Sequence, residues 1–201
     1  MRIRSFLTFA LLAALAGPSL ANFEGKPPLP SSQLPTSGQS GDGSGTPTVR
    51  QQAERLYGDA YDDVARARDA VLWSKPKDAE KKYRRALERA KQAVALDTTY
   101  HEAWNLVGFA SRKLGDYPAS LAAYRTCLRQ RFDYAPAREY YGEALLETGD
   151  LKGARDQIVW LRRLKAEDLA VQLENAIEAK AGPANAEPSA GASKSDSTGT
   201  H

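Results

Sequence analysis

Apolar positions in residues 49–181 recur every three to four residues, and no stretch alternates apolar with polar positions. This spacing is typical of amphipathic helices rather than strands. Leu169, Leu173 and Ile177, for example, recur every four residues, with charged residues on the opposite face of the helix. The pattern therefore predicts an all-α region over residues 49–181, which is long enough to bury a stable core.

The helical pattern stops at both ends of this region. Residues 22–48 and 182–201 are rich in Pro, Ser and Gly and show no apolar periodicity. Segments of this composition bury too little apolar surface to offset the entropy lost on ordering. We therefore expect a disordered linker at 22–48 and a disordered tail at 182–201.

One turn sequence occurs twice within the helical region, 34 residues apart. Gly115-Asp116 and Gly149-Asp150 each precede an apolar residue. Glycine readily adopts the left-handed conformation that ends many helices, and aspartate is favoured where the next helix begins. The recurrence predicts two helical hairpins of equal length.

The wider pattern resembles the tetratricopeptide repeat (TPR), a helix–turn–helix unit of 34 residues. Residues 103–110, AWNLVGFA, look like the start of that family's first helix, and matching residues stand one repeat later at Ala137, Tyr141, Gly142 and Ala144. A third copy begins upstream with Ala53, Tyr57, Gly58 and Ala60. The resemblance implies a TPR superhelix of three repeats, about 51–100, 101–134 and 135–168, closed by a capping helix over about 166–181.

The first of these repeats is longer than 34 residues. Gly58 and Gly108 stand 50 positions apart, 16 more than one repeat. Sixteen residues shared by two helices lengthen each by about two turns. We predict helices near 50–73 and 78–97, joined through residues 74–77. Trp73 is expected to cap the interior of the long hairpin; the alternative is an exposed anchor for a partner.

The N-terminus has the features of a secretory signal. Arg2 and Arg4 precede an apolar stretch at 6–16, and residues 19–21, Ser-Leu-Ala, fit a signal-peptidase site. We expect a signal peptide over 1–21, cleaved after Ala21, and a periplasmic or secreted protein; a retained anchor is the alternative. Cleavage removes two of 28 basic residues and none of the 25 acidic ones, so the formal charge falls from +3 to +1. Such a chain is not typical of nucleic-acid binders.

The composition offers little material for catalysis. Histidine occurs only at His101 and His201, and Cys127 is the only cysteine. Neither a histidine cluster nor a thiolate metal site can be built from these residues. We expect no enzyme activity, no catalytic residues, no metal and no cofactor. Cys127 occupies a repeat position that holds small buried side chains, so we expect it to be buried.

Surface recognition is the function that remains. In the resembled family the first helices line a concave groove, and their register assigns the candidate groove residues. These are Asp59, Asp62, Asp63, Asn105, Phe109, Arg112, Lys113, Glu139, Tyr140, Glu143 and Glu147. We expect a non-catalytic adaptor of the cell envelope that binds a peptide or protein segment with basic and apolar residues. The alternative is that the charges only solvate this face.

Two other functions stay open. The chain is alternatively a subunit or accessory factor of an envelope enzyme or assembly complex. The helix at 78–97 is strongly basic, which would suit contact with an anionic membrane or polymer. Its cations are Lys81, Lys82, Arg84, Arg85, Arg89 and Lys91. They spread over more than one face, as on a solvated helix, so membrane contact is the less favoured interpretation. No particular oligomeric state is predicted.

Overall fold

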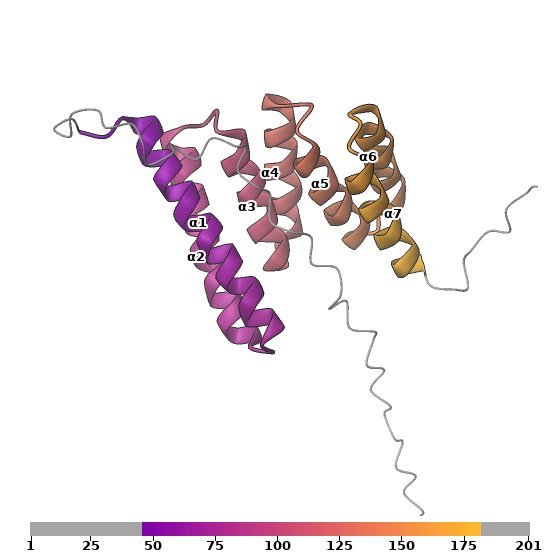
Figure 1. Cartoon of the computed structure of the whole chain (residues 1–201), viewed down its shortest axis with the longest axis horizontal. Coiled ribbons are helices and arrows are strands. Elements are labelled where there is room, and N and C mark those ends of the chain that lie inside the picture. The colour runs from indigo at the N-terminus through magenta and orange to yellow at the C-terminus, as the bar shows by residue number, and fades with distance from the viewer. Residues whose placement is uncertain (1–45, 182–201) are drawn as a thin grey trace, which may run out of the picture.

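The computed structural model describes residues 46–181, which form helices and connecting turns without a strand (Figure 1). The helices are α1 (Val49–Leu72), α2 (Pro76–Leu96), α3 (His101–Lys113), α4 (Tyr117–Gln130), α5 (Ala135–Glu147), α6 (Leu151–Arg163) and α7 (Glu167–Ala181). The predicted all-α class is confirmed. The signal peptide, the tail and nearly all of the linker lie outside the described residues.

The helices pack as successive pairs, α1 with α2, α3 with α4 and α5 with α6, and α7 packs on both helices of the last pair. Figure 1 shows the pairs following one another along the molecule. Leu173 and Ile177 of α7 are buried in the core that α7 shares with α5 and α6. The fold is therefore a helical-repeat solenoid of three hairpins and a capping helix, as the spacing predicts.

The first helices of the pairs touch one another. α1 contacts α3, α3 contacts α5 and α5 contacts α7, whereas no comparable contact joins α2 to α4 or α4 to α6 within residues 46–181. The first helices thus lie closer together than the second helices do, and the array curves toward them. We call the layer of α1, α3 and α5 the inner wall.

The two recurring turns have the expected geometry. Gly115 and Gly149 have φ angles of 78° and 89°, in the left-handed region that favours glycine. The Asp116 side chain accepts the backbone N–H of Ala119 at 3.1 Å, and that of Asp150 accepts the N–H of Gly153 at 2.8 Å. These bonds satisfy amides that have no partner inside the helix, so the chain reverses at a predictable place.

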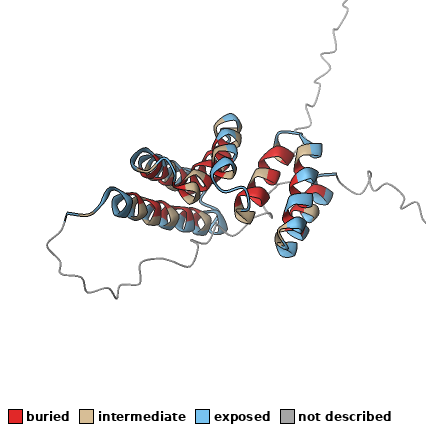
Figure 2. Ribbon diagram, turned by 90° about the horizontal axis from the view of Figure 1, so that it is seen from above, coloured by how far each residue is buried: buried red, intermediate tan, exposed pale blue. Residues whose placement is uncertain are grey.

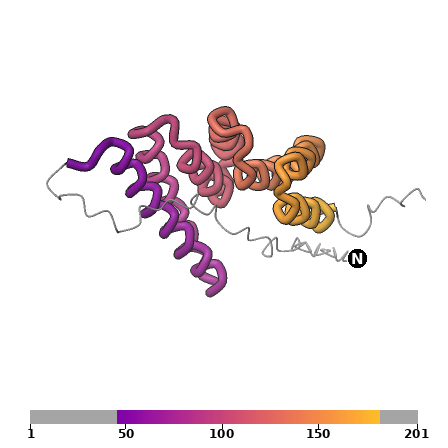
Figure 3. The backbone as a smooth tube through the Cα atoms, turned by 45° about the horizontal axis from the view of Figure 1, so that its top comes forward, coloured from indigo at the N-terminus to yellow at the C-terminus, as the bar shows by residue number. Residues whose placement is uncertain are grey.

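The first hairpin projects beyond the others. α1 has 24 residues and α2 has 21, against 13 or 14 in each helix of the later pairs. Counted from the matching positions Gly58 and Gly108, the end of α1 is nine residues longer than the end of α3. The beginning of α2 supplies the other seven residues of the insertion. The hairpin therefore extends roughly 12 Å past the ordinary turn, at about 1.5 Å per residue (Figures 1 and 3).

The tip of this hairpin differs from the prediction in two respects. Pro76 begins α2 instead of lying in the link, because its missing N–H would have no helical partner at that position. Trp73 is 76% exposed and does not cap the hairpin interior. Ala70 and Ala79 fill that interior and are buried. Their small side chains let the helices approach closely, which leaves no room for an indole ring.

One core runs through the whole array. A first group of buried side chains extends from Ala53 to Ala144 and a second from Leu145 to Ile177, and Leu121 and Tyr141 pack against both. Figure 2 shows the buried residues concentrated on helix faces that turn toward neighbouring helices. At Gly108, an added Cβ would lie 2.7 Å from a ring carbon of the fully buried Tyr124. Glycine is thus needed there for α3 and α4 to pack.

Candidate functional site

The candidate groove residues divide into an exposed and a buried set. Asp59 and Asp62 on α1 are exposed, and Lys113 and Glu147 are half-buried. The buried set is Asp63, Asn105, Phe109, Arg112, Glu139, Tyr140 and Glu143. The inner wall therefore exposes fewer of the candidate side chains than the resemblance implies. For the buried residues of α3 and α5 the cause is the curvature, because the first helices touch one another and cover the side chains between them.

Phe109 and Tyr140 belong to the core. Phe109 is fully buried, and its ring centroid lies 5.2 Å from that of Tyr140 and 6.3 Å from that of Tyr83, both in edge-to-face geometry. The three rings join α2, α3 and α5. The expectation that Phe109 and Tyr140 are open to the groove is therefore corrected: in this structure their rings hold the inner wall together.

Asp63 is a brace between the first two helices. Its carboxylate is fully buried and accepts a 2.8 Å hydrogen bond from Nε of Arg85, a shorter one from Arg89 and a 3.5 Å one from Arg66. Placing Asp63 in a groove was wrong, because it points at α2. The sequence contained the signal: Asp63 stands among the inward-facing positions Ala60 and Ala67 and therefore requires cationic partners.

Arg112 is the centre of a buried ionic cluster between α3 and α5. It forms an ion pair with Glu143, and its Nη1 lies 2.7 Å from Oε1 of Glu147. Its guanidinium also lies near the rings of Phe109 and Tyr140, at 5.7 and 6.0 Å from the centroids. One buried cation thus connects the second and third pairs.

The carboxyl groups of Glu139 and Glu143 on α5 are hard to ionise. Burial is the main cause that raises the pKa of Glu139 well above its usual range, and the charge of Glu143 adds to it; Arg112 and Lys113 act in the opposite direction. Burial likewise raises the pKa of Glu143, against the same two cations. The cluster would therefore accept a further positive charge.

Several buried polar side chains of the inner wall have atoms without a hydrogen-bond partner, and two of them, Asn105 and Glu139, hold equivalent repeat positions. The buried amide nitrogen and oxygen of Asn105 and the buried Oε1 of Glu139 have no hydrogen-bond partner among residues 46–181. Asn105 and Glu139 stand 34 positions apart, at the same place in α3 and α5. Buried polar groups usually find a partner, so a repeated exception marks a place where a ligand's donors and acceptors would be stabilised.

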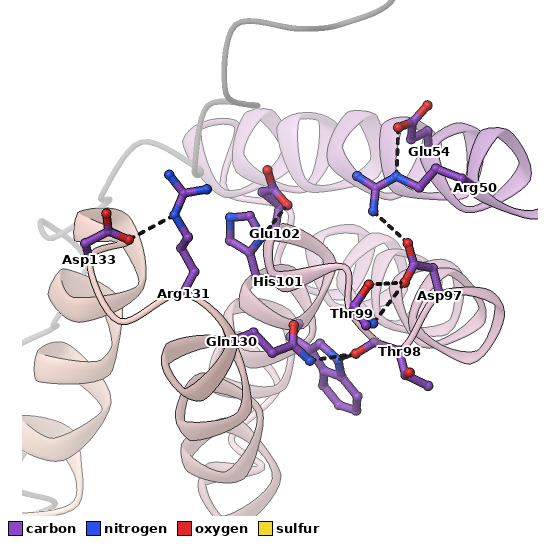
Figure 4. A network of polar contacts seen from close by, with 11 residues as sticks. Arg50, Glu54, Asp97, Thr98, Thr99, His101, Glu102, Gln130, Arg131 and Asp133 are labelled. Atoms are coloured by element: carbon purple, nitrogen blue, oxygen red, sulfur yellow. Dashed lines mark hydrogen bonds and ion pairs between the residues drawn. The ribbon is translucent and has the colours of Figure 1, made fainter.

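A polar network surrounds the α2–α3 connection, at the end of the helices opposite the hairpin turns (Figure 4). Arg50 reaches Asp97 at 2.7 Å, and the carbonyl oxygen of Thr98 accepts from Gln130 Nε2 at 2.6 Å and from Trp104 Nε1 at 2.9 Å. His101 lies in the same corner, 3.0 Å from Glu102, and burial lowers its pKa. These contacts fix the angle between the first and second pairs.

Cys127 is fully buried, as predicted, and burial raises the pKa of its thiol to about 12. Within the described part of the chain, no group of three or more His, Cys, Asp or Glu residues could hold a metal ion. None of the described helices is long and apolar enough to cross a bilayer.

Fold and site together define a class of architecture, a curved helical-repeat array whose inner wall carries a buried ionic cluster beside unpartnered polar groups. No protein-family profile matches this sequence, and no curated protein is significantly similar to it.

Proposed function

We propose that the protein is a non-catalytic adaptor of the tetratricopeptide-repeat type, exported to the cell envelope, that binds a peptide or protein segment along its inner wall. The observation that carries the proposal is the pair Asn105 and Glu139, equivalent positions on α3 and α5 with unmet hydrogen-bonding capacity. Adjacent repeats that offer the same kind of group suit an extended chain, since its polar groups also recur at regular intervals.

The chemistry of the two groups specifies the ligand. A carboxamide such as Asn105 can donate to a peptide carbonyl and accept from a peptide N–H. The free oxygen of Glu139 is an acceptor in a cluster that would gain a cation, so it favours lysine or arginine. Asp59 and Asp62, exposed on α1, add negative charge to the same wall. The ligand is therefore a basic peptide, and apolar contacts to Phe109 and Tyr140 are no longer part of the proposal.

The burial of Asn105 and Glu139 should slow the association of a peptide. The atoms of Asn105 and Glu139 are covered in the ligand-free chain, so a peptide must displace side chains before it reaches them. Binding that requires such a rearrangement is slower than the association of rigid surfaces. We expect association rate constants below the usual 10⁵–10⁷ M⁻¹s⁻¹ of protein complexes.

The proposal is tested with a library of fluorescent ten-residue peptides that differ in their content of Lys, Arg, Asp and Glu. Basic peptides should bind at least tenfold more tightly than acidic ones. The variant Asn105→Leu/Glu139→Gln, which preserves side-chain shape, should bind roughly tenfold more weakly, the effect of losing about 1.4 kcal/mol of hydrogen bonding.

The matched control is Glu178→Gln, which removes an exposed carboxylate from α7, a helix that is not part of the inner wall. It should bind as the unaltered chain does. The proposal fails if the double variant unfolds at the same temperature as the unaltered chain and binds basic peptides equally well. It also fails if acidic peptides bind best.

A further inference from the structure

The tip of the first hairpin exposes three consecutive large apolar side chains. Val71, Leu72 and Trp73 are 37%, 73% and 76% exposed. No other place in residues 46–181 has three exposed large hydrophobic residues in succession. Contiguous exposed apolar side chains are costly in water and mark surfaces that contact something less polar.

The same tip carries a net positive charge. Residues 64–82, the part that projects past the ordinary turn, contain six Lys or Arg and three Asp or Glu, a net charge of +3. Lys75, Lys77 and Lys81 form no ion pair with any described residue. Between Ala70 and Lys77 there is no acidic residue at all. Apolar side chains thus lie at the apex, with uncompensated cations directly behind them.

The other two hairpin turns have the opposite chemistry. Their connections, residues 114–116 and 148–150, each contain one Asp and no Lys or Arg, and they join helices of 13 or 14 residues. The apolar and basic character therefore belongs to the projecting hairpin alone. Because that hairpin extends roughly 12 Å further, its tip can reach a flat surface that the rest of the array does not touch.

The projecting hairpin is held together by its own packed interior. Asp63 ties its base to Arg85 and Arg89, and Val64, Ala67, Ala70 and Ala79 form a buried seam along its length. Exposed Trp73 needs no rearrangement to leave water, since it already points away from this seam. Ser74 makes the sharp reversal at the tip with a φ of 53°.

We propose that residues 71–77 form a membrane-contact tip that inserts Leu72 and Trp73 into the interfacial region of an anionic bilayer. The indole ring suits that region, where one edge meets hydrocarbon and the other meets water. Lys75, Lys77 and Lys81 then lie at the level of the anionic headgroups, with their alkyl chains along the apolar surface. The unpaired lysines behind the apolar apex favour an anionic bilayer over a protein partner, because they match its layer of negative headgroups. This site is separate from the inner wall and does not depend on peptide binding.

Vesicle binding tests the membrane-contact tip. The probe is sedimentation of the chain from residue 22 onward with vesicles of phosphatidylcholine, either pure or with 30 mol% phosphatidylglycerol. That chain keeps its fold because the packed core lies within residues 53–177. Binding to the anionic vesicles should exceed binding to neutral ones at least tenfold and should fall steeply in 0.5 M salt.

Two variants separate the apolar and the ionic contributions. Leu72→Ser/Trp73→Ser should reduce the partition coefficient at least tenfold. Lys75→Gln/Lys77→Gln should reduce it by up to about 25-fold in low salt, at about fivefold per lysine. The matched control is Phe132→Ser, because Phe132 is 64% exposed but lies in the α4–α5 connection, at the other end of the helices. It should change binding less than twofold.

Each alternative outcome overturns the proposal. Equal binding of the Leu72→Ser/Trp73→Ser variant and the unaltered chain would show that the tip does not insert. Equal binding to neutral and anionic vesicles would remove the role of the lysines. Absence of vesicle binding, together with a protein that is retained by the unaltered chain and lost with the tip variant, would make the tip a protein-docking site instead.

Discussion

The first hairpin and the two later ones are built on the same plan but are stabilised differently. α1 and α2 meet along a seam of small side chains, mainly alanine, and their one buried charge, Asp63, is bonded to arginines whose outer parts reach water. α3 and α5 instead enclose aromatic rings and a buried arginine with its glutamates. The two kinds of packing place different limits on the length of a hairpin.

A small-residue seam can be lengthened without a partner on either side. Each added turn of α1 and α2 contributes another alanine pair and needs no third helix, so the insertion projects freely from the array. The later pairs have neighbours on both sides and must keep their length, because their rings and charges are shared between pairs. The extension is therefore found at the end of the array, where only one neighbour constrains it.

The largest predicted effect concerns the charge shared between the later pairs. Arg112→Met should lower the free energy of unfolding by about 3–5 kcal/mol at pH 8, because Glu143 then stays buried without its ion-pair partner. Urea unfolding followed by circular dichroism measures the change. Arg162→Met is the control, since Arg162 pairs with Glu167 and Glu174 in solvent, and it should lose less than about 1 kcal/mol.

The loss should depend on pH in a defined direction. Burial raises the pKa of Glu139 and Glu143 in the folded chain above the ordinary value near 4.5, so the folded state holds their protons more tightly than the unfolded state. Stability from these groups is complete below pH 4.5 and is lost as the pH rises through the raised values. Arg112→Met should therefore be less harmful at pH 5 than at pH 8. An equal loss at both values would contradict the buried cluster.

The three pairs also show what a sequence can and cannot predict. The turns at Gly115 and Gly149, the 16-residue insertion and the burial of Cys127 follow from local chemistry and register, and the structure confirms them. The exposure of Phe109 was predicted wrongly, because it depends on how closely α1, α3 and α5 approach. That curvature is a sum of packing contacts between helices distant in sequence, and no local pattern encodes it.

The second prediction compares two neighbouring aspartates of the first hairpin. Asp63→Asn should cost about 2 kcal/mol, because it weakens charge-assisted bonds to Arg85 and Arg89 at a fully buried position. Asp62→Asn should cost less than about 0.5 kcal/mol, since Asp62 has one exposed ion pair with Arg66 at 3.8 Å. Both are measured by urea unfolding. Equal losses would mean that the brace does not form.

The last comparison uses one substitution, Gly→Ala, at equivalent positions of two repeats. Its effect on the free energy of unfolding should have opposite signs at the two positions. Gly58 and Gly108 hold the same place in the first and second repeats. A Cβ at Gly58 meets nothing within 4 Å, whereas one at Gly108 would overlap the Tyr124 ring. Gly58→Ala should stabilise the chain by about 0.5–1 kcal/mol, since alanine costs less entropy in a helix. Gly108→Ala should destabilise it by about 1–3 kcal/mol through overpacking.

Thermal and urea unfolding of the two alanine variants would reveal the difference directly. If Gly58→Ala also destabilised the chain, some part of the first repeat would have to pack against Gly58 as Tyr124 packs against Gly108. If both variants were neutral, Tyr124 would be free to move, and the close approach of α3 and α4 would not depend on glycine. Only opposite signs fit a first hairpin held by small side chains beside a second pair held by a large ring.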